Sequence, residues 1–338
     1  MNKKLFLISK NFGNVFGGAE KSLIEIAKLY EKKGYQINYF NFSSSINNKK
    51  FSNLSKSWNR INIKLFNVSF YFFYLDFFIN FINLLKLKNY IDKNDSVIIN
   101  GNFLPIHNFL KSKKIFLSIR AVGELGIDRN NNPTFSFRYF IKIFLNIFNF
   151  FPRIFWKLMV FNCKKSEYHF NSQYLINLFK NKNKNKIKLK IKYYPPIIDK
   201  KIIIRFKKIK NKHIKKGIVL MGNSNYKGVH IFKEIASNFK NELFYIFDLK
   251  QKKRFRLGNI IYMPWLSSPM QYSYAKLVLI PSICGEAYCR TAIETQLLKI
   301  NLLVSDDAGL KYSVRNKKLR IKNFRNPKEW IKKINVLI

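Results

Sequence analysis

The chain alternates short, unbroken apolar runs with longer stretches in which apolar side chains recur every three or four positions. Unbroken runs are typical of strands buried on both faces of a parallel sheet, and the longer period is typical of amphipathic helices. Two complete strand–helix–strand units stand out, at 5–40 and 277–304. This alternation predicts an α/β protein with parallel sheets. Strands are predicted at 5–9, 36–40, 96–100, 115–119, 168–172, 217–221, 244–247, 260–263, 277–280, 302–304 and 319–321.

Two aromatic-rich stretches are candidates for membrane segments. The first, 66–87, is interrupted by Asp76 and by several Asn residues, and its length is borderline for a span. A buried helix before the strand at 96–100 is therefore favoured. The second, 135–160, carries Lys or Arg every few residues, which excludes an ordinary transmembrane helix. It has the composition of a helix lying in a membrane interface, and packing against the N-terminal sheet is an equal alternative. Pro152 is expected to break it into two helices.

Composition narrows the class of protein. The 338 residues fit two domains more easily than one, and a hydrophobic content of 47% supports real cores. The 63 Lys and Arg against 18 Asp and Glu give a net charge of +45, which by itself points to nucleic acid or an anionic membrane. The chain is also rich in Asn, Ile, Phe and Tyr, as expected from coding DNA poor in G and C. No zinc finger, homeodomain-like or aromatic RNA-binding motif accompanies the charge, so no nucleic-acid partner is predicted.

Cysteine usage indicates a reducing compartment. The three cysteines, Cys163, Cys284 and Cys289, are odd in number and unevenly spaced, which argues against a disulfide framework. The apolar run near the N-terminus is too short for a signal peptide and is better explained as the first strand. A cytoplasmic location is expected.

The most informative stretch joins the strands at 277–280 and 302–304. Glu286 lies on the loop after the first of these strands, followed by Tyr288, Cys289 and Arg290, and Glu294 lies about one turn inside the next helix. Ligands in such folds bind outside the carboxyl ends of the strands. The free amides of the helix N-terminus attract phosphate, and carboxylates accept hydrogen bonds from hydroxyl groups. The stretch therefore predicts a site that combines hydroxyl and anion binding.

This pattern is Pro-Ser-x-x-x-Glu, then seven residues and a second Glu, followed by a strand and Ser-x-x-x-Gly. It resembles the C-terminal donor-site motif of retaining GT-B glycosyltransferases of the glycosyltransferase 4 family. The resemblance covers nearly the whole chain. Gly17 and Gly18, after the first strand, resemble the Gly-Gly-Ala-Glu-like loop that in the family faces the donor phosphates and the acceptor. Ser118-Ile-Arg120-Ala resembles a Ser-x-Arg-Gly sequence found in a subset of members.

Two further segments of the second half match the family. Gly222 and Lys227, followed by Gly228, resemble the loop whose basic residues hold the donor diphosphate at a helix N-terminus. Met263-Pro264-Trp265 lies where relatives read the nucleobase with main-chain groups.

The resemblance implies an α/β, GT-B fold, with two Rossmann-like doubly wound parallel-sheet domains facing a cleft. Pro195-Pro196 occupies the place of the interdomain hinge of relatives. The expected division is an acceptor-side domain at 1–195, a nucleotide-sugar-binding domain at 196–325 and a C-terminal helix at 326–338 that crosses back to the first domain.

The implied reaction transfers a sugar from a nucleotide-diphosphate-sugar to a hydroxyl acceptor with retention of configuration. It needs no metal ion and no cofactor besides the nucleotide sugar as co-substrate. Lys227 and Arg290, together with the main-chain amides of Tyr288, Cys289 and Arg290, are expected to bind the donor and stabilise its leaving diphosphate, and Glu294 to bind the donor ribose. Glu286 is expected to contact the transferred sugar, and Arg120 the donor or the acceptor. These last two are the candidate catalytic residues.

The chain departs from the family pattern at Asn223, where an arginine is usual, at Cys289, where glycine is common, and at Tyr312, where glutamate is frequent. These departures motivate an alternative, a GT-B-fold glycan-binding protein that has lost transfer. A basic protein that binds anionic lipid or nucleic acid is a second alternative, supported by charge alone. The expected partners are a nucleotide sugar and a glycan or lipid-linked acceptor, as in the assembly of surface polysaccharide or lipopolysaccharide. A lipid-linked acceptor would fit peripheral association with the inner face of an anionic membrane.

Overall fold

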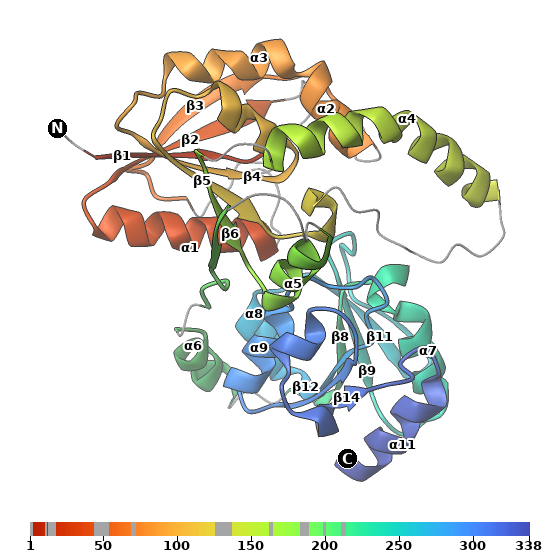
Figure 1. The fold of residues 1–338 in the computed structure, drawn as a ribbon. Helices are drawn as coiled ribbons and strands as arrows, with labels where there is room; N and C mark the ends of the chain where they lie inside the picture. Colours follow the sequence, from red (N-terminus) through yellow and green to blue (C-terminus); the bar gives the residue numbers. More distant parts are fainter. Residues whose placement is uncertain are drawn as a thin grey trace. The chain divides into compact units, whose positions relative to one another are not determined.

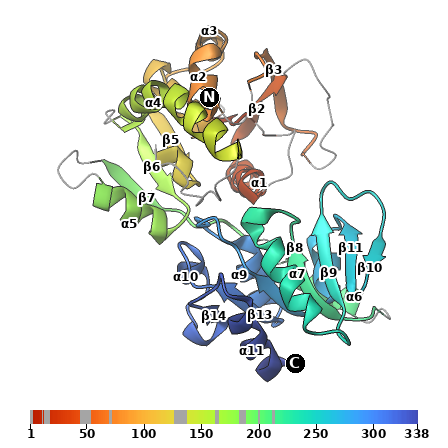
Figure 2. The ribbon, with the colours of Figure 1, turned by 90° about the vertical axis from the view of Figure 1, so that its right-hand side faces the viewer.

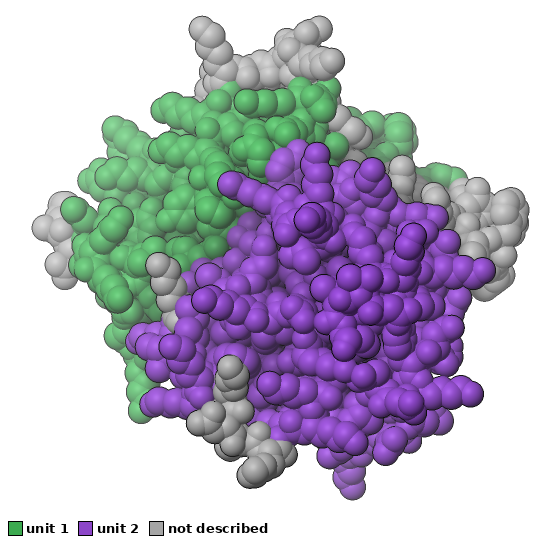
Figure 3. All heavy atoms as spheres, turned by 90° about the horizontal axis from the view of Figure 1, so that it is seen from below, with its two compact units in different colours: residues 1–197 green, residues 198–338 purple. Residues whose placement is uncertain are grey.

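The computed structural model describes residues 3–10, 12, 18–43, 54–68, 72–125, 137–161, 165–182, 189–198, 201–210 and 214–338, and within these ranges residues 19, 137–146, 182 and 210 are described by their backbone alone. The chain forms two compact units, Met1–Ile197 and Ile198–Ile338, which Figure 3 shows in different colours. Each unit contains its own seven-stranded sheet. The predicted α/β class is confirmed.

The first sheet has the strand order β3-β2-β1-β4-β5-β6-β7, and its strand pairs are parallel. This is the Rossmann order, 3-2-1-4-5-6, with a seventh strand added at one edge. The strands β2 and β3, which follow β1 in the chain, lie on one side of it, and β4 and the strands that follow it lie on the other. The loops after β1 and β4 therefore leave the same edge of the sheet side by side. The strands are β1 (Lys4–Ile8), β2 (Gln36–Ser43), β3 (Asn59–Lys64), β4 (Ser96–Asn100), β5 (Lys114–Ile119), β6 (Glu167–Phe170) and β7 (Lys190–Tyr193).

The helices of the first unit connect these strands (Figure 1). Ser172 caps α5, because its hydroxyl accepts a hydrogen bond of 3.3 Å from the Leu175 N–H. The α-helices are α1 (Gly18–Lys32), α2 (Phe73–Ile79), α3 (Phe81–Leu85), α4 (Phe137–Phe161) and α5 (Gln173–Lys182). In the described residues of this unit, the 3-10 helices η2 (Lys86–Asn89), η3 (Gly101–Phe109) and η4 (Val122–Leu125) accompany them.

The second sheet has the order β10-β11-β9-β8-β12-β13-β14, parallel except for the edge strand β10. In Figure 2, β9, β11 and β10 lie on one side of β8, and β13 and β14 lie on the other. Without the antiparallel edge strand β10, the remaining six strands follow the Rossmann order 3-2-1-4-5-6. Its strands are β8 (Gly217–Met221), β9 (Phe244–Asp248), β10 (Phe255–Leu257), β11 (Ile260–Pro264), β12 (Ala275–Ile280), β13 (Asn301–Ser305) and β14 (Arg320–Ile321).

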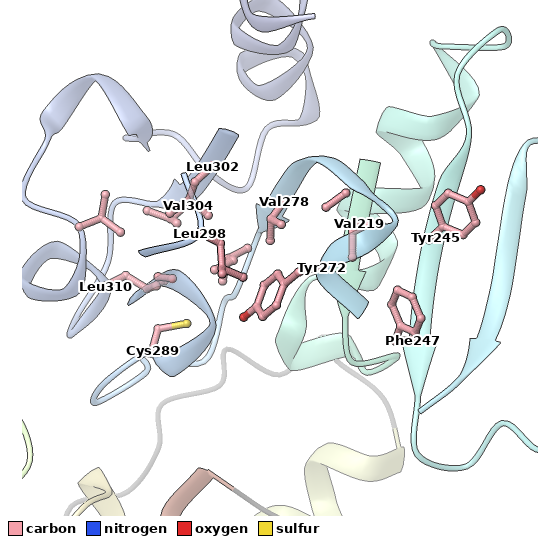
Figure 4. Packing of buried hydrophobic residues seen from close by; sticks show 14 of the residues in the cluster. Val219, Tyr245, Phe247, Tyr272, Val278, Cys289, Leu298, Leu302, Val304 and Leu310 are labelled. Atoms are coloured by element: carbon pink, nitrogen blue, oxygen red, sulfur yellow. The ribbon is translucent and has the colours of Figure 1, made fainter. Parts of the chain in front are cut away.

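Both faces of the second sheet are buried, which is why its strands appear in the sequence as unbroken apolar runs. Alternate residues of one strand belong to different clusters: Val278 and Ile280 to one, Leu277 and Leu279 to the other. Figure 4 shows the first cluster, to which Tyr272 and Cys289 also belong. The helices of this unit are α6 (Lys201–Lys210), η5 (Asn225–Lys227), α7 (Val229–Ser237), α8 (Ser268–Ser273), α9 (Arg290–Leu297), α10 (Leu310–Ser313), η6 (Lys317–Leu319) and α11 (Pro327–Leu337).

Two helices differ from the expectations of the sequence. We expected α11 to cross back to the first domain, but its buried side chains, Trp330 and Ile334, lie in the core of the second unit, where α11 packs on α7. The helix α6 was not predicted, because its many Lys and Arg residues are typical of an exposed loop. Ile202 of α6 is buried in the second core, and α6 packs on α8.

The two aromatic-rich stretches also correct the sequence prediction. The helix α4 is continuous for 25 residues through Pro152, whereas we expected a break there. Proline removes one N–H and crowds the preceding turn, but packing of Trp156 and Val160, both fully buried, stabilises the helix beyond it. The stretch 66–87 contains α2, α3 and η2 rather than one helix. At the junction of α2 and α3, the buried Asn80 side chain accepts a hydrogen bond of 2.7 Å from the Phe66 N–H.

His107, in η3, is a fully buried neutral imidazole. Its Nε2 lies 3.1 Å from the Met159 carbonyl oxygen and its Nδ1 lies 2.7 Å from Ser166 Oγ. Because a carbonyl only accepts, Nε2 carries the proton and Nδ1 accepts from the serine. Burial lowers the pKa of His107 to about 4.

The first domain is therefore expected to lose stability as the pH falls from about 6.5 to about 4, because the unfolded chain binds a proton that the buried imidazole does not. Between pH 7.5 and pH 5 the free energy of unfolding should fall by about 2 kcal/mol through this residue. Urea unfolding at both pH values, compared between the wild type and His107→Asn, measures it. An equal pH dependence in the two proteins would contradict the assignment.

Candidate functional site

The second-domain residues predicted from the motifs gather at one edge of the second sheet. The strands β8 and β12 are paired neighbours, and the chain proceeds from them to opposite sides of the sheet. Proteins with open α/β sheets bind ligands at the carboxyl end of such a switch point. The loops at 222–228 and 281–289 leave the sheet here, and α9 begins directly after the second loop.

The two loops are locked to each other through their backbones. Gly228 ends the first loop with a φ of 76°, and a Cβ at this position would lie 1.9 Å from the Pro281 carbonyl oxygen. The Ile283 N–H donates to the Tyr226 carbonyl at 3.0 Å, and Ser282 Oγ lies 3.3 Å from the same carbonyl oxygen. Only glycine allows this close approach, which brings the neighbouring Lys227 to the second loop.

Lys227 and Glu286 join the two loops by an ion pair. Lys227 Nζ donates to Glu286 Oε1 at 2.7 Å, and Ser282 Oγ donates to the same oxygen at 2.8 Å. The Gly309 N–H donates to the Glu286 carbonyl at 2.7 Å, and a Cβ at Gly309 would lie 2.0 Å from the Ala287 carbonyl oxygen. Ser282 and Gly309 of the motif thus both contact Glu286, one at its side chain and the other at its backbone.

Both members of the pair are charged. Burial raises the pKa of Glu286, but the Lys227 charge and the hydrogen bonds from Lys227 and Ser282 lower it below its ordinary value overall. Burial lowers the pKa of Lys227, but the Glu286 carboxylate raises it above its ordinary value overall. The Lys227 side chain is 34% exposed and that of Glu286 is 9% exposed. The exposed part of the pair is therefore the cation, which suits contact with an anion.

Glu294, inside α9, is a buried carboxylate with a fixed orientation. The Tyr272 hydroxyl donates to its Oε2 at 3.0 Å, and Arg290 Nη2 lies 3.5 Å from its Oε1. Burial, and then the Glu294 charge, raise the pKa of Tyr272 well above its ordinary value, so Tyr272 remains a donor. Each carboxylate oxygen accepts up to two hydrogen bonds, so Glu294 has capacity for the hydroxyl groups of a ligand.

The other predicted residues of these loops differ in what they offer a ligand. Gly222 has a φ of 112°, and its N–H donates to the Phe247 carbonyl at 2.9 Å. Tyr288 is partly exposed on the second loop. Cys289 is 3% exposed in the core, and its N–H donates to Ser313 Oγ at 3.2 Å. Burial, and then the Glu286 charge, raise the pKa of the Cys289 thiol well above its ordinary value. The side chain and the N–H of Cys289 thus make contacts inside the domain, and they are less available to a ligand than the partly exposed neighbouring residues.

The segment expected to read the nucleobase, Met263 to Trp265, lies at the carboxyl end of β11, two strands away from β8. Met263 is buried and Pro264 is partly buried at the end of β11, where Pro264 lies beside Asp248 of β9. Trp265 packs against the core cluster and is partly buried. Asn223, which stands in place of the family's arginine, donates to Asp248 Oδ2 at 3.3 Å. The hydrogen bond from Asn223 therefore joins the loop after β8 to the end of β9.

In the first domain, Arg120 lies at the end of β5 and is only 9% exposed. Its Nε donates to Ser118 Oγ at 2.7 Å, and it lines a cavity together with Ser118, His169 and Tyr194. Arg120 is thus not an ordinary basic surface residue. Gly18 is the first residue of α1, and Gly17 lies outside the described residues.

A polar cluster that no sequence motif predicts lies at the switch point of the first sheet. Lys10, after β1, donates to Asp76 Oδ2 at 2.6 Å, and the side chain of Asn102, after β4, donates to the same oxygen. Asp76 is 2% exposed, and burial raises its pKa despite these partners. The available signal was a carboxylate within an aromatic stretch of a chain that has few carboxylates. Tyr272 was also missed, and no motif in the sequence identifies it.

Among the residues that the structure describes, no group of three or more His, Cys, Asp or Glu side chains is arranged to hold a metal ion. Metal independence of the reaction stays a prediction. None of the helices in the described part of the chain combines the length and the apolarity needed to cross a membrane.

Comparison with known proteins shows the fold. No protein-family model and no curated protein sequence matches the chain. Solved structures do match it. Sucrose-phosphate synthase from Thermosynechococcus elongatus has a TM-score of 0.73 at 10% identity, over 99% of this chain and 89% of that one. A trehalose-phosphate synthase (UDP-forming) from Burkholderia xenovorans, in complex with glucose-6-phosphate, has a TM-score of 0.67 at 10% identity, over 99% and 92%. HepE from Anabaena, in complex with UDP, has a TM-score of 0.65 at 15% identity, over 99% and 89%. The chain has the GT-B fold, with two Rossmann-like domains.

Proposed function

We propose that this protein is a retaining, metal-independent glycosyltransferase. It moves a sugar from a nucleotide-diphosphate-sugar to a hydroxyl of a glycan or lipid-linked acceptor, in the synthesis of surface polysaccharide or glycolipid. The observation that carries the proposal is the Lys227–Glu286 pair at the switch point of a GT-B second domain, with Glu294 held nearby on α9. The motif that resembles the glycosyltransferase 4 family contains both glutamates.

The chemical demand of this reaction is the stabilisation of a departing diphosphate. As the bond between the anomeric carbon and the diphosphate oxygen breaks, negative charge builds up on that oxygen, and a preorganised cation lowers the barrier. Lys227 supplies this charge, because its side chain is held by Glu286 yet remains 34% exposed. Arg290, at the first position of α9, adds a second cation beside the helix N-terminus.

The two glutamates have separate tasks. Glu294 accepts hydrogen bonds from the donor ribose, since Tyr272 and Arg290 fix its carboxylate while its oxygens retain lone pairs. Glu286 positions Lys227 and contacts the transferred sugar. Met263, Pro264 and Trp265 receive the nucleobase, and Arg120 contacts the donor or the acceptor. The oxygen of the acceptor hydroxyl bonds to the anomeric carbon on the same face from which the diphosphate departs, which gives retention, and the hydroxyl proton passes to the departing diphosphate oxygen.

The ligands of the similar structures guide the first test, because HepE was solved with UDP and the Burkholderia enzyme is described as UDP-forming. Thermal unfolding should be measured with uridine, guanosine, adenosine and thymidine diphosphates and with their sugars. A ligand at 100 times its dissociation constant stabilises the folded state by about 2.7 kcal/mol, so one base is expected to raise the melting temperature clearly. If none of the four diphosphates and none of their sugars shifted the melting temperature, the proposal would be contradicted.

A second candidate is a glycan-binding protein of the same fold without transferase activity. It is favoured by Asn223, whose side chain donates to Asp248 where the family pattern has an arginine. Release of nucleoside diphosphate from the stabilising sugar nucleotide, with and without added acceptors, separates the two candidates. An active enzyme releases it, and a binding protein does not.

A further inference from the structure

The described side chains of α4, which begin at Ile147, form a continuous apolar face toward solvent. Ile147, Phe151, Ile154, Phe155 and Leu158 are between 40% and 67% exposed. They recur at intervals of three and four residues, so they lie along one side of the helix. A row of large apolar side chains is unusual at the surface of a soluble domain and marks an interaction site.

The opposite side of α4 attaches the helix to the first domain. Trp156 and Val160 are fully buried, and Trp156 Nε1 donates to the Asn102 carbonyl at 3.0 Å. The Trp156 ring packs on Phe73 and Tyr74, and Figure 1 shows this part of α4 beside α2. The helix is therefore already packed against its own domain on one side, and the exposed face is additional to that contact.

Charge identifies the kind of partner. Arg153 and Lys157 lie one turn apart, between the exposed face and the buried side, and both are partly exposed. The segment 137–161 contains two further basic residues and no Asp or Glu, in a chain with a net charge of +45. Large apolar side chains flanked by cations are suited to a surface that is apolar below and anionic at its rim.

We propose that the exposed face of α4 docks on an anionic lipid bilayer, with the helix lying in the plane of the interface. Phe151, Phe155 and Leu158 enter the boundary of the acyl chains, and Arg153 and Lys157 meet the anionic headgroups. A second copy of the chain is a poorer occupant, because pairing two such faces brings basic side chains of two highly basic molecules together. The inference stands on α4 alone and does not rest on the proposed transfer reaction.

Cosedimentation with phosphatidylcholine vesicles, with and without phosphatidylglycerol, tests the docking surface. The wild type is expected to bind only the anionic vesicles, and added salt should weaken binding. The double variants Phe151→Gln/Phe155→Gln and Arg153→Gln/Lys157→Gln should each reduce the partition coefficient about tenfold or more. The matched control is Ile82→Gln/Val336→Gln, which removes side chains that are 77% and 84% exposed outside α4. The control should bind like the wild type.

A second measurement covers the case in which a double variant does not fold. In Phe155→Trp, a conservative change at a side chain that is 57% exposed, the new indole should be quenched by lipids brominated on their acyl chains. Lack of vesicle binding by the wild type, equal binding by the folded α4 variants, or an unquenched indole in bound protein would each overturn the proposal. A dimer that dissociates on Phe151→Gln/Phe155→Gln would assign the face to a second copy instead, and preference for single-stranded nucleic acid over vesicles would assign it to that polymer.

Discussion

Lys227→Met is expected to lower the turnover of nucleotide sugar by about 10²- to 10³-fold, the usual effect of removing one preorganised group that stabilises a developing negative charge. Methionine keeps most of the length and the apolar stem of lysine but cannot neutralise a diphosphate. Lys227 is well placed for this task, because Gly228 lets its loop approach Pro281 and Glu286 holds its ammonium group. Initial rates of nucleoside diphosphate release measure the effect.

The variant also leaves the Glu286 carboxylate without its counter-charge, so a structural effect must be separated from a catalytic one. The free energy of unfolding should fall by about 1–2 kcal/mol, less than for a fully buried pair because Lys227 is 34% exposed. In Lys227→Met/Glu286→Gln the stranded charge is gone, and stability should recover while activity does not. Wild-type turnover in folded Lys227→Met, or recovery of activity in the double variant, would contradict the proposed role.

Glu294→Ala is expected to weaken donor binding and to lower kcat/KM by about 10²- to 10⁴-fold. Hydrogen bonds to a charged group contribute about 1.5–3 kcal/mol each, and the proposal assigns two ribose hydroxyls to this carboxylate. Both oxygens are already oriented, one by the Tyr272 hydroxyl at 3.0 Å and one by Arg290 at 3.5 Å, so little ordering is left for the ligand to impose. Titration calorimetry with the nucleoside diphosphate measures the loss directly.

Two further variants define what Glu294 does. Tyr272→Phe removes one hydroxyl and keeps the ring in the core, so affinity for the donor should fall about tenfold through the loss of one hydrogen bond to a charged group. Glu329→Gln, at an exposed glutamate of α11, is the control and should leave binding unchanged. Unchanged affinity in folded Glu294→Ala would exclude a role in ribose binding.

Much of the second domain could be predicted from the sequence because its strands are buried on both faces. The predicted strand 217–221 matches β8, the C-terminal helix predicted at 326–338 corresponds to α11 at Pro327–Leu337, and the other strands of its core differ by one or two residues at their ends. In the first domain, β3 was missed, since its alternation of polar and apolar residues is short and is followed by an aromatic stretch. Periodicity in the sequence predicts local structure, and the periodic signal is weakest for strands at the edge of a sheet.

The candidate site likewise has features that the sequence predicts and features that only the tertiary structure reveals. The sequence by itself determined the spacing of Glu286 and Glu294 and the position of Lys227 between a strand and a helix. Only the tertiary structure decided that Lys227 pairs with Glu286 across 59 residues, that Tyr272 holds Glu294, and that Cys289 belongs to the core. The physical reason is that strand and helix patterns arise from neighbours along the chain, whereas a side-chain partner is chosen by how closely two loops approach. At this site a single glycine, Gly228, sets that approach.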